Sequence, residues 1–370
     1  GPFTAERLDS VYGPDGWRAM LRFSVHQTKP DGTPKIRPCD DAAASSHNLC
    51  TSLGETITCE TADWPARVAA LFASFLGLEG DWGMCGGTDD IELAYRQCPS
   101  RTPQYTVFAL ADPESGAPAY FILPGMNFGL ISAVNQFNRL PELVCAFARR
   151  RCGVVLTHYF DDYCVCEPSF AGASGQALLL HIHSLIGMPL SKEKHERASS
   201  RFVFLGVLHD FSRFAKEKVM HMRPKPGRVQ TILATIAAIL AAGTLAHGAA
   251  ASLRGKLQFL LCTAGAGMRI ARSALAALAS VRKGGPLSHP VRTVLTFLQF
   301  LLPILPSRLV NLRERARRSQ SKPVLVWSDA AWEESSATGG LGFVVWFPPG
   351  HPGASPRKGR FRYAARKGVR

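Results

Sequence analysis

Two adjacent aspartates, Asp161 and Asp162, are flanked on both sides by residues typical of β-strands. The run Val154–His158 precedes them and Cys164–Val165 follows, so the sequence predicts a β-hairpin that presents both carboxylates at its tip. Adjacent ionised carboxylates repel each other, and neutralisation by a divalent cation is one reason for such a pair. The alternative is an ordinary solvated turn, where aspartates are common.

A second acidic run, Asp89–Glu92, lies upstream of this pair. Two strand ends whose carboxylates converge are what two-metal nucleotidyl transfer requires. One ion activates the attacking 3′-hydroxyl, and the other holds the triphosphate and stabilises the leaving oxygen. The spacing alone leaves this metal site and two unrelated solvated turns as equal alternatives.

The basic residues are concentrated in one part of the chain, which carries a formal net charge of +15. Residues 223–318 hold 15 Lys and Arg against one carboxylate, Glu314, whereas residues 1–222 hold 20 against 24. Unpaired basic side chains repel one another unless something neutralises them. The distribution therefore indicates a polyanionic partner, with nucleic acid as the first candidate and an anionic membrane surface as the second.

The longest apolar stretch, Val229–Ala246, repeats its large residues with the period of one helix face. This pattern favours an amphipathic helix over a membrane span, so no membrane partner is expected. The chain opens without a signal peptide or an initiator Met, which is consistent with a piece excised from a longer polyprotein. Other domains of that parent protein are therefore expected partners.

The ten cysteines lack the density and even spacing of a secreted disulfide scaffold. A reduced, intracellular protein is expected, without a distinction between nucleus and cytoplasm. Cys164 and Cys166 lie near His158, but no second Cys/His pair has zinc-ligand spacing, so both are interpreted as buried strand residues. The remaining histidines, including His183 and His195, accompany no Ser or Cys nucleophile and are interpreted as surface or packing residues.

Four regions follow from the pattern of apolar runs and turn residues. Residues 1–79 combine a hairpin rich in turn residues with a helix at about 62–77, and 80–222 alternate short β-type runs with helices. Residues 223–318 are Ala- and Leu-rich helices, and 319–370 contain a basic link, two strand-like runs and a Pro-, Gly- and Arg-rich tail. The alternation in the second region predicts an α+β sheet with helices on one side.

Helical periodicity is clear at 62–77, 131–151 and 174–187. In the first of these helices, the apolar face that is expected to be buried consists of Leu71, Phe72, Phe75 and Leu76.

Several motifs follow one another in a fixed order. Asp90 is followed by Ala94 and Tyr95, the loop Gly129–Ala133 precedes the helix at 131–151, and Tyr159 opens the aspartate pair. This series resembles the palm motifs of the reverse transcriptases of retroelements.

Three further motifs extend the resemblance along the chain. Gly187–Lys194 resembles the fourth palm motif, whose lysine lies near the triphosphate. Phe204-Leu205-Gly206 matches the hairpin that grips the primer end. Upstream, Lys35 and Arg37 resemble the basic residues of the fingers hairpin that contacts the incoming triphosphate.

The resemblance implies a metal site and a nucleotide filter. Asp90 and Asp161 would bind metal most directly and Asp162 less so, with two Mg²⁺ ions per site and Mn²⁺ as the alternative. Tyr95 would block ribonucleotides by meeting their 2′-hydroxyl. Its alternative role is that of an ordinary core residue.

The remaining roles concern nucleotide and nucleic acid. Lys35, Arg37, Phe128 and Gly129 would form the nucleotide-binding site, with strand-edge charges as the alternative for the first two.

Lys192 and Lys194 share one loop, and a lysine near the β-phosphate would act as a general acid toward the departing pyrophosphate; Lys194 is preferred. The segment Phe204-Leu205-Gly206, together with Arg254 and Lys256, would contact the primer and the template–primer duplex.

Two resemblances concern the subgroup and the C-terminal region. Arg37–Asp41 and Ser252–Leu257 are more similar to the tyrosine-recombinase (DIRS-like) retroelements than to retroviruses. Residues 324–331 and 340–346 resemble the first two strands of a ribonuclease H domain, in which Asp329 would bind metal; a β-hairpin packed on the preceding helices is the alternative. Only 41 residues follow Asp329, too few for the other carboxylates, so ribonuclease H activity is not expected.

The expected fold is therefore an α+β right-hand polymerase with fingers, a ferredoxin-like palm, a helical thumb and connection, and a partial ribonuclease H-like segment. The expected reaction is addition of dNTPs to a primer 3′-hydroxyl on an RNA or DNA template. An RNA-dependent RNA polymerase is one alternative, against which Tyr95 and the Phe204-Leu205-Gly206 hairpin argue. A decayed or domesticated element that only binds nucleic acid is another, against which the three intact carboxylates argue.

Overall fold

The computed structural model describes residues 2–28, 32–263, 271–320, 325–333, 338–347 and 360–369. The chain divides into two compact units, Gly1–Val310 and Asn311–Arg370. Both are built from short elements, and the first is mixed α+β with several small sheets. Among the described residues, no helix combines the length and apolar character needed to cross a membrane.

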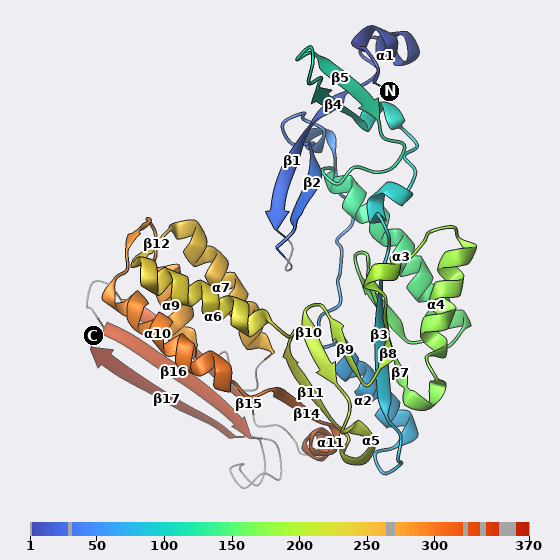
Figure 1. Ribbon diagram of the computed structural model, residues 1–370. Helices are drawn as coiled ribbons and strands as arrows, with labels where there is room; N and C mark the ends of the chain where they lie inside the picture. The colour runs from blue at the N-terminus through green and yellow to red at the C-terminus, as the bar shows by residue number, and fades with distance from the viewer. Residues whose placement is uncertain are drawn as a thin grey trace. The chain divides into compact units, whose positions relative to one another are not determined.

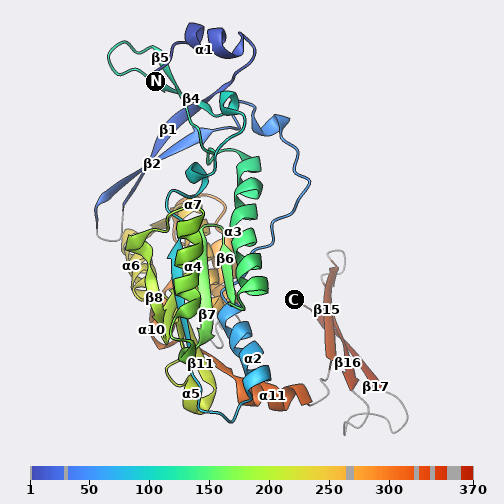
Figure 2. The same cartoon turned by 90° about the vertical axis from the view of Figure 1, so that its right-hand side faces the viewer.

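One four-stranded sheet carries the two acidic runs at the same end. Its strand order is β6-β7-β3-β8, and all neighbouring strands are antiparallel. The strands are β3 (Met84–Asp90), β6 (Leu156–Tyr159), β7 (Asp162–Pro168) and β8 (Glu196–Ser199). The helices α3 (Ile131–Arg151) and α4 (Ser174–Leu185) cover one face of it (Figures 1 and 2). The predicted sheet with helices on one side is confirmed.

The core of this region lies between the sheet and its helices. In β7, Tyr163, Cys164, Val165 and Cys166 are all fully buried, because strands flank β7 and other elements cover both of its faces. The cysteines therefore have the buried strand positions that the sequence predicts. On the other face, a Cβ added to Gly86 would lie 2.4 Å from the Phe202 ring, so glycine is required for this close approach.

The first two strands of the chain and two later ones form another sheet, in the order β2-β1-β4-β5. Its strands are β1 (Ala19–Thr28), β2 (Pro34–Asp41), β4 (Val107–Ala111) and β5 (Pro118–Ile122), with α1 (Ala5–Tyr12) before them. The first two strands form the predicted antiparallel hairpin. Asn48, in the short helix η1 (Asn48–Cys50), donates to the Gly129 carbonyl and accepts from the Ile131 N–H. This contact ties the region after the hairpin to the start of α3.

The predicted helix at 62–77 is α2 (Trp64–Leu76), but the prediction of its buried face is wrong. Phe75 is 78% exposed and Leu71 is 47% exposed, whereas Trp64 and Val68 are buried. The contacts of α2 with the sheet run to β7. The buried residues of α2 all lie in its N-terminal half. The larger side chains of its last turns do not pack into the core.

A second small sheet, in the order β14-β11-β10-β9, follows in the chain. Its strands are β9 (Arg201–Phe204), β10 (Val207–Asp210), β11 (Val219–Pro224) and β14 (Arg308–Asn311), and α5 (Phe214–Glu217) precedes β11. The fully buried Lys218 connects this sheet to the start of β3. Its ammonium donates to the carbonyls of Gly80, Trp82 and Ala215 at 2.6, 3.1 and 2.7 Å.

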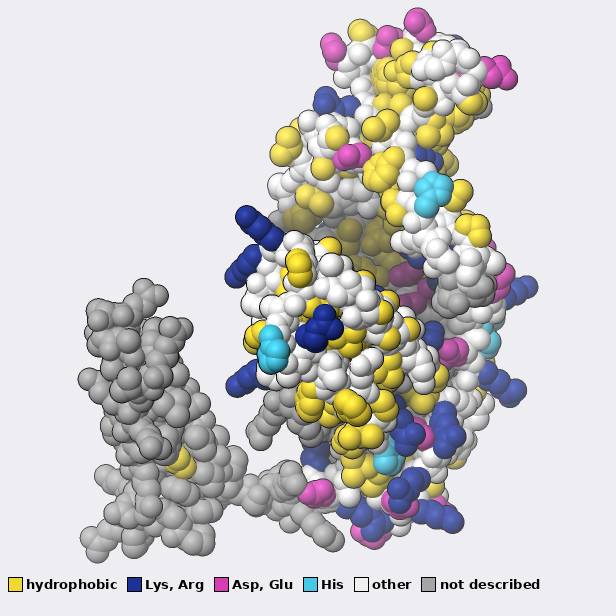
Figure 3. Space-filling model, turned by 60° about the vertical axis from the view of Figure 1, so that its left-hand side comes forward, with side chains coloured by type: hydrophobic (Ala, Val, Ile, Leu, Met, Phe, Trp, Pro, Cys, Tyr) yellow, Lys and Arg dark blue, Asp and Glu magenta, His cyan; other side chains and the backbone are white. Residues whose placement is uncertain are grey.

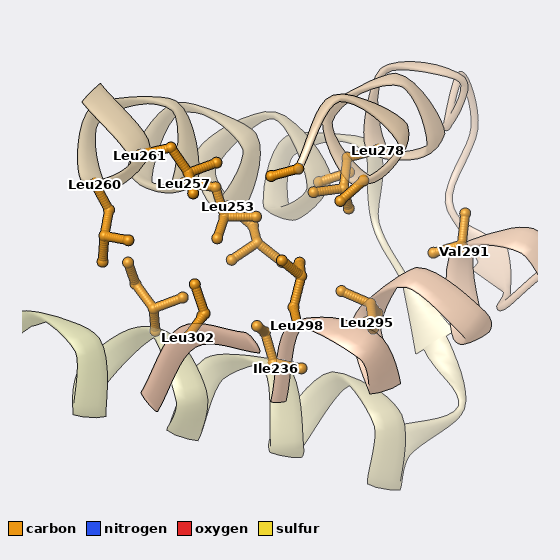
Figure 4. Close-up of a cluster of buried hydrophobic side chains, with 14 of the residues drawn as sticks. Ile236, Leu253, Leu257, Leu260, Leu261, Leu278, Val291, Leu295, Leu298 and Leu302 are labelled. Atoms are coloured by element: carbon orange, nitrogen blue, oxygen red, sulfur yellow. The ribbon is translucent and has the colours of Figure 1, made fainter. Parts of the chain in front are cut away.

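The described residues between 228 and 304 form a helical bundle. It contains α6 (Arg228–Ala242), α7 (His247–Cys262), α9 (Arg272–Ala279) and α10 (His289–Ile304), with a short β12–β13 pair at Thr244–Leu245 and Gly285–Pro286. Leucines such as Leu257 and Leu298 point toward one another in its core (Figure 4). Ile232 and Ile236 of α6 are buried there, so the predicted amphipathic helix is confirmed.

The second unit contains α11 (Leu312–Gln320) and a three-stranded antiparallel sheet, β15-β16-β17. The strands are β15 (Leu325–Glu333), β16 (Thr338–Phe347) and β17 (Arg360–Val369). The first two contain the strand-like runs that the sequence predicts. The third corrects the expected irregular tail, because Arg360–Val369 pairs along the whole of β16.

Candidate active site

The two acidic runs meet across paired strands. Asp90, the last residue of β3, lies directly opposite Asp162, the first residue of β7. Phe160 and Asp161 form the turn between β6 and β7, and Phe160 adopts a left-handed conformation with φ of 53°. The Ile91 N–H donates to the Asp161 carbonyl at 2.9 Å, which fixes this turn against the end of β3. The predicted hairpin and the convergence of the two runs are therefore present.

The three carboxylates differ in exposure and electrostatics. Asp90 is 6% exposed, Asp161 is half-buried and Asp162 is exposed. Crowding by protein atoms raises the pKa of Asp162, and a hydrogen bond with Asp90 and repulsion from Asp161 raise it further. Burial also raises the pKa of Asp161. Figure 3 shows acidic side chains recessed in a hollow near the middle of the visible face.

The oxygen donors at this site fit Mg²⁺. Among the described residues, no group of three or more His, Cys, Asp and Glu side chains is arranged to hold a metal ion. Asp90 and Asp162 nevertheless provide two neighbouring oxygen donors, and their mutual repulsion favours a cation between them. Mg²⁺ is commonly bound by one or two carboxylates together with phosphates and water, rather than by a protein cage.

Lys194 provides a positive charge beside these acids. Its Nζ lies 2.6 Å from Asp90 Oδ1. The short helix η5 (Lys192–Lys194) presents it, and the Ser191 N–H donates to the Asp90 main-chain carbonyl at 2.8 Å. Of the two lysines in this loop, Lys194 is the one that contacts a carboxylate of the site.

The neighbouring acid, Asp89, has a different environment. It is 2% exposed, and it accepts from His195 Nδ1 at 2.6 Å and from Gln176 Nε2 at 2.8 Å. His195 is exposed, as the interpretation of it as a surface residue expects, and its ring also bonds the buried Asp89. The sequence signal was available, because Lys194-His195 is a basic pair that matches the acidic pair Asp89-Asp90.

Tyr95 lies in an aromatic group next to the site. Leu93 and Ala94 both have positive φ, 56° and 40°, a costly conformation for non-glycine residues that turns the chain sharply after β3 into η2 (Ala94–Gln97). The Tyr95 ring lies 4.5 Å from the Phe137 ring and 4.8 Å from the Phe128 ring. Burial raises the pKa of Tyr95 to about 12. The residue is thus part of the core and also borders Phe128, which is half exposed.

Gly129 allows the loop before α3 to lie against β2. A Cβ at this position would be 2.0 Å from the Asp40 carbonyl oxygen, so any larger residue would push the loop away. This close packing places Phe128 beside Tyr95, where the sequence analysis expects the nucleotide.

The hairpin β9–β10 faces the carboxylates across a cavity of about 390 Å³ that Asp90, Asp162, Lys194, Leu205 and Gly206 help to line. Leu205 and Gly206 form its turn, both with positive φ.

Phe204, in contrast, is 2% exposed and supports the hairpin from inside. It also lines the same cavity, and its expected contact with the primer stays a prediction.

Two further basic residues lie near this hairpin, and the sequence motifs did not predict them. Lys225 lines the same cavity, and its N–H donates to the Gly206 carbonyl at 3.0 Å. The Arg228 guanidinium lies over the Phe259 ring at 4.4 Å and closely approaches Gly206. The only sequence signal was their position, directly after the hairpin.

The other expected binding residues belong to other elements of the chain. Lys35 and Arg37 are exposed on β2, two residues apart and so on the same face of the strand. Arg254 and Lys256 are exposed on α7. Asp329 belongs to the second unit, where its backbone pairs with Gly342.

These elements together define a reverse transcriptase-like fold. The chain is similar to a solved structure of the foamy viral protease-reverse transcriptase in complex with dsDNA, with a TM-score of 0.53 and 14% identity. The match covers 94% of this chain and 60% of the viral chain. No family model and no curated protein sequence matches the chain.

Proposed function

We propose that this chain is an RNA-directed DNA polymerase of a retroelement that adds dNTPs to a primer 3′-hydroxyl under the direction of a template. The observation that supports this most is the pairing of Asp90 with Asp162 at one end of the sheet, with Lys194 beside them. The Leu205-Gly206 turn lies across a shared cavity, where a primer end would be held.

The proposed subdomains follow the regions expected from the sequence. Residues 1–79 are the fingers and N-terminal region, 80–222 the palm with part of the fingers, 223–318 the thumb and connection, and 319–370 the partial ribonuclease H-like segment. Within this region, the four strands of one sheet and the two helices that cover it follow one another as β3, α3, β6, β7, α4 and β8. With the strand order β6-β7-β3-β8, this arrangement is that of a ferredoxin-like fold.

In this proposal Asp90, Asp161 and Asp162 hold two Mg²⁺ ions, which when bound lower the pKa of the attacking hydroxyl and neutralise phosphate charge. The primer 3′-hydroxyl loses its proton to water and its oxygen forms a bond to the α-phosphorus, while the bond from that phosphorus to the β-phosphate oxygen breaks. Lys194 gives a proton to the departing pyrophosphate. Phe128 and Tyr95 border the sugar of the incoming nucleotide.

Nucleic acid is the proposed macromolecular partner. The solved foamy viral structure is a complex with dsDNA, and residues 223–318 of this chain hold 15 basic residues against one acidic residue. Exposed cations on α7, including Arg254 and Lys256, are placed to neutralise duplex phosphates. Such contacts are independent of sequence, as a polymerase requires.

A primer-extension assay tests this function. The full chain with Mg²⁺ is given a primed RNA or DNA template and either dNTPs or NTPs, and Asp161→Asn is compared with Glu114→Gln, a substitution of an exposed carboxylate outside the site. We expect extension with dNTPs that is lost only in Asp161→Asn. Extension with NTPs alone would identify an RNA-dependent RNA polymerase, and duplex binding without extension would identify a nucleic-acid-binding protein.

A further inference from the structure

Asp89 is almost completely buried, although it is a carboxylate next to the proposed metal ligands. Its side chain is 1% exposed, and its two oxygens have separate donors, His195 Nδ1 at 2.6 Å and Gln176 Nε2 at 2.8 Å. A buried carboxylate is tolerated when its oxygens are hydrogen-bonded. Asp89 is therefore a fixed hydrogen-bond acceptor, because each of its carboxylate oxygens is bonded to one of these donors.

The loop after α4 is attached to β3 at two successive residues. Lys194 contacts Asp90 and the next residue, His195, contacts Asp89, so an adjacent basic pair meets an adjacent acidic pair. Successive residues of a strand point to opposite faces. The two contacts consequently hold the loop from both faces of β3, and Asp89 and His195 line the same cavity as Asp162 and Lys194.

Gln176, a residue of α4, stabilises the contact between the loop and β3 by further hydrogen bonds. It is 3% exposed and, besides its bond to Asp89, its Nε2 donates to the Glu196 carbonyl at 2.9 Å. Its Oε1 accepts from the Ala198 N–H at 2.8 Å. A Cβ at Gly87 would lie 2.7 Å from the Gln176 amide, so the glycine makes room for it. One side chain thus joins α4, β3 and β8.

We propose that Asp89, His195 and Gln176 are positioning residues that hold the loop of Lys194 so that its ammonium stays at the reacting phosphates. This inference rests on the proposed polymerase function. None of the three side chains is assigned a contact with substrate, and their effect passes through Lys194.

Single-turnover primer extension in the full chain tests the proposal. His195→Ala is expected to lower the rate of nucleotide addition by about tenfold to a hundredfold, with duplex affinity unchanged, because a displaced catalytic group loses its alignment. His195→Asn restores most of the rate, since its amide nitrogen can take the place of Nδ1. His181→Ala, which changes an exposed histidine on α4, is the matched control and leaves the rate unchanged.

A double-mutant cycle separates positioning from a general structural role. In a Lys194→Ala background, adding His195→Ala is expected to change the rate by less than about twofold, because the group that it positions is already gone. If His195→Ala slows the reaction by the same factor in both backgrounds, the proposal is wrong.

Hydrogen exchange of the backbone amides at 190–199 provides a measurement that needs no catalysis. We expect faster exchange in His195→Ala than in the unsubstituted chain and in His195→Asn. If these three proteins exchange equally fast, the contact of His195 with Asp89 does not hold the loop. The proposal is then wrong even if the chain extends primers. If the chain extends no primer at all, the proposed function fails, and the exchange measurement still decides whether Asp89 and His195 fix the loop.

Discussion

Lys194 and Asp90 lie 104 residues apart in the sequence, and their side chains meet at 2.6 Å between Nζ and Oδ1. The contact places a mobile, strongly charged group beside the carboxylate that is proposed to bind metal. It also distinguishes Lys194 from Lys192, which belongs to the same short helix. The geometry therefore assigns different expected roles to two lysines that the sequence presents as equivalent.

Replacing Lys194 by Ala is expected to lower the single-turnover rate of dNTP addition by about a hundredfold, the usual contribution of a positioned general acid. Lys192→Ala, in the same loop, is the matched control and should change the rate little. Both variants should bind the template–primer duplex as the unsubstituted chain does, measured by fluorescence anisotropy. A larger loss in Lys192→Ala than in Lys194→Ala would reverse the assignment.

Substitution of Tyr95 tests the nucleotide filter. Tyr95→Ala is expected to raise incorporation of NTPs relative to dNTPs, because the ring next to Phe128 would no longer occupy the space of a 2′-hydroxyl. Tyr95→Phe keeps the ring and should keep the discrimination. The Ala variant also loses packing on Phe137, which costs roughly 3 kcal/mol of stability, so its melting temperature is measured alongside. Unchanged discrimination in a folded Ala variant would leave Tyr95 as a core residue only.

Charge reversal on the helical bundle tests duplex binding. Arg254, Lys256 and Arg272 are exposed there, whereas Arg269, another basic residue of this region, lies outside the described residues. The triple change to Glu is expected to weaken duplex binding and flatten its dependence on salt, because fewer counterions are released.

Reversal of Arg150 and Arg151, which are exposed at the end of α3, is the matched control for this change. If the triple variant binds the duplex as tightly as this control does, the basic residues of the bundle face solvent and do not contact the duplex.

A buried histidine predicts a loss of stability in acid. His209 of β10 is fully buried and stacks on Phe202, and burial lowers its pKa from 6.5 to about 4. Below pH 6.5, His209 takes up a proton in the unfolded chain but stays neutral in the folded chain. The free energy of unfolding therefore falls as the pH drops toward 4. The loss amounts to roughly 3 kcal/mol over this interval.

Urea unfolding at several pH values measures this effect. His209→Phe should unfold with a weaker dependence on pH than the unsubstituted chain between pH 6.5 and 4, whereas His181→Phe, on an exposed position, should not change the dependence. An identical pH profile for the unsubstituted chain and His209→Phe would show that His209 is not the group responsible.

Local patterns predicted much of the fold because their physical causes are local. The period of apolar residues gave α3 and α6, and the β-type runs on both sides of Asp161 and Asp162 gave the hairpin. The exposed Phe75 on α2 shows the limit of this reasoning. An apolar face is buried only where a neighbouring element covers it, and periodicity carries no information about that neighbour.

The sequence by itself determined that two acidic strand ends, ordered among recognisable motifs, precede a basic helical region. Only the tertiary structure decided which side chains each acid contacts. Asp89 and Asp90 are chemically identical neighbours, but alternation along β3 turns the first toward Gln176 and His195 and the second toward Asp162 and Lys194. The direction of that alternation is set by which face α4 covers, a contact between segments far apart in the chain.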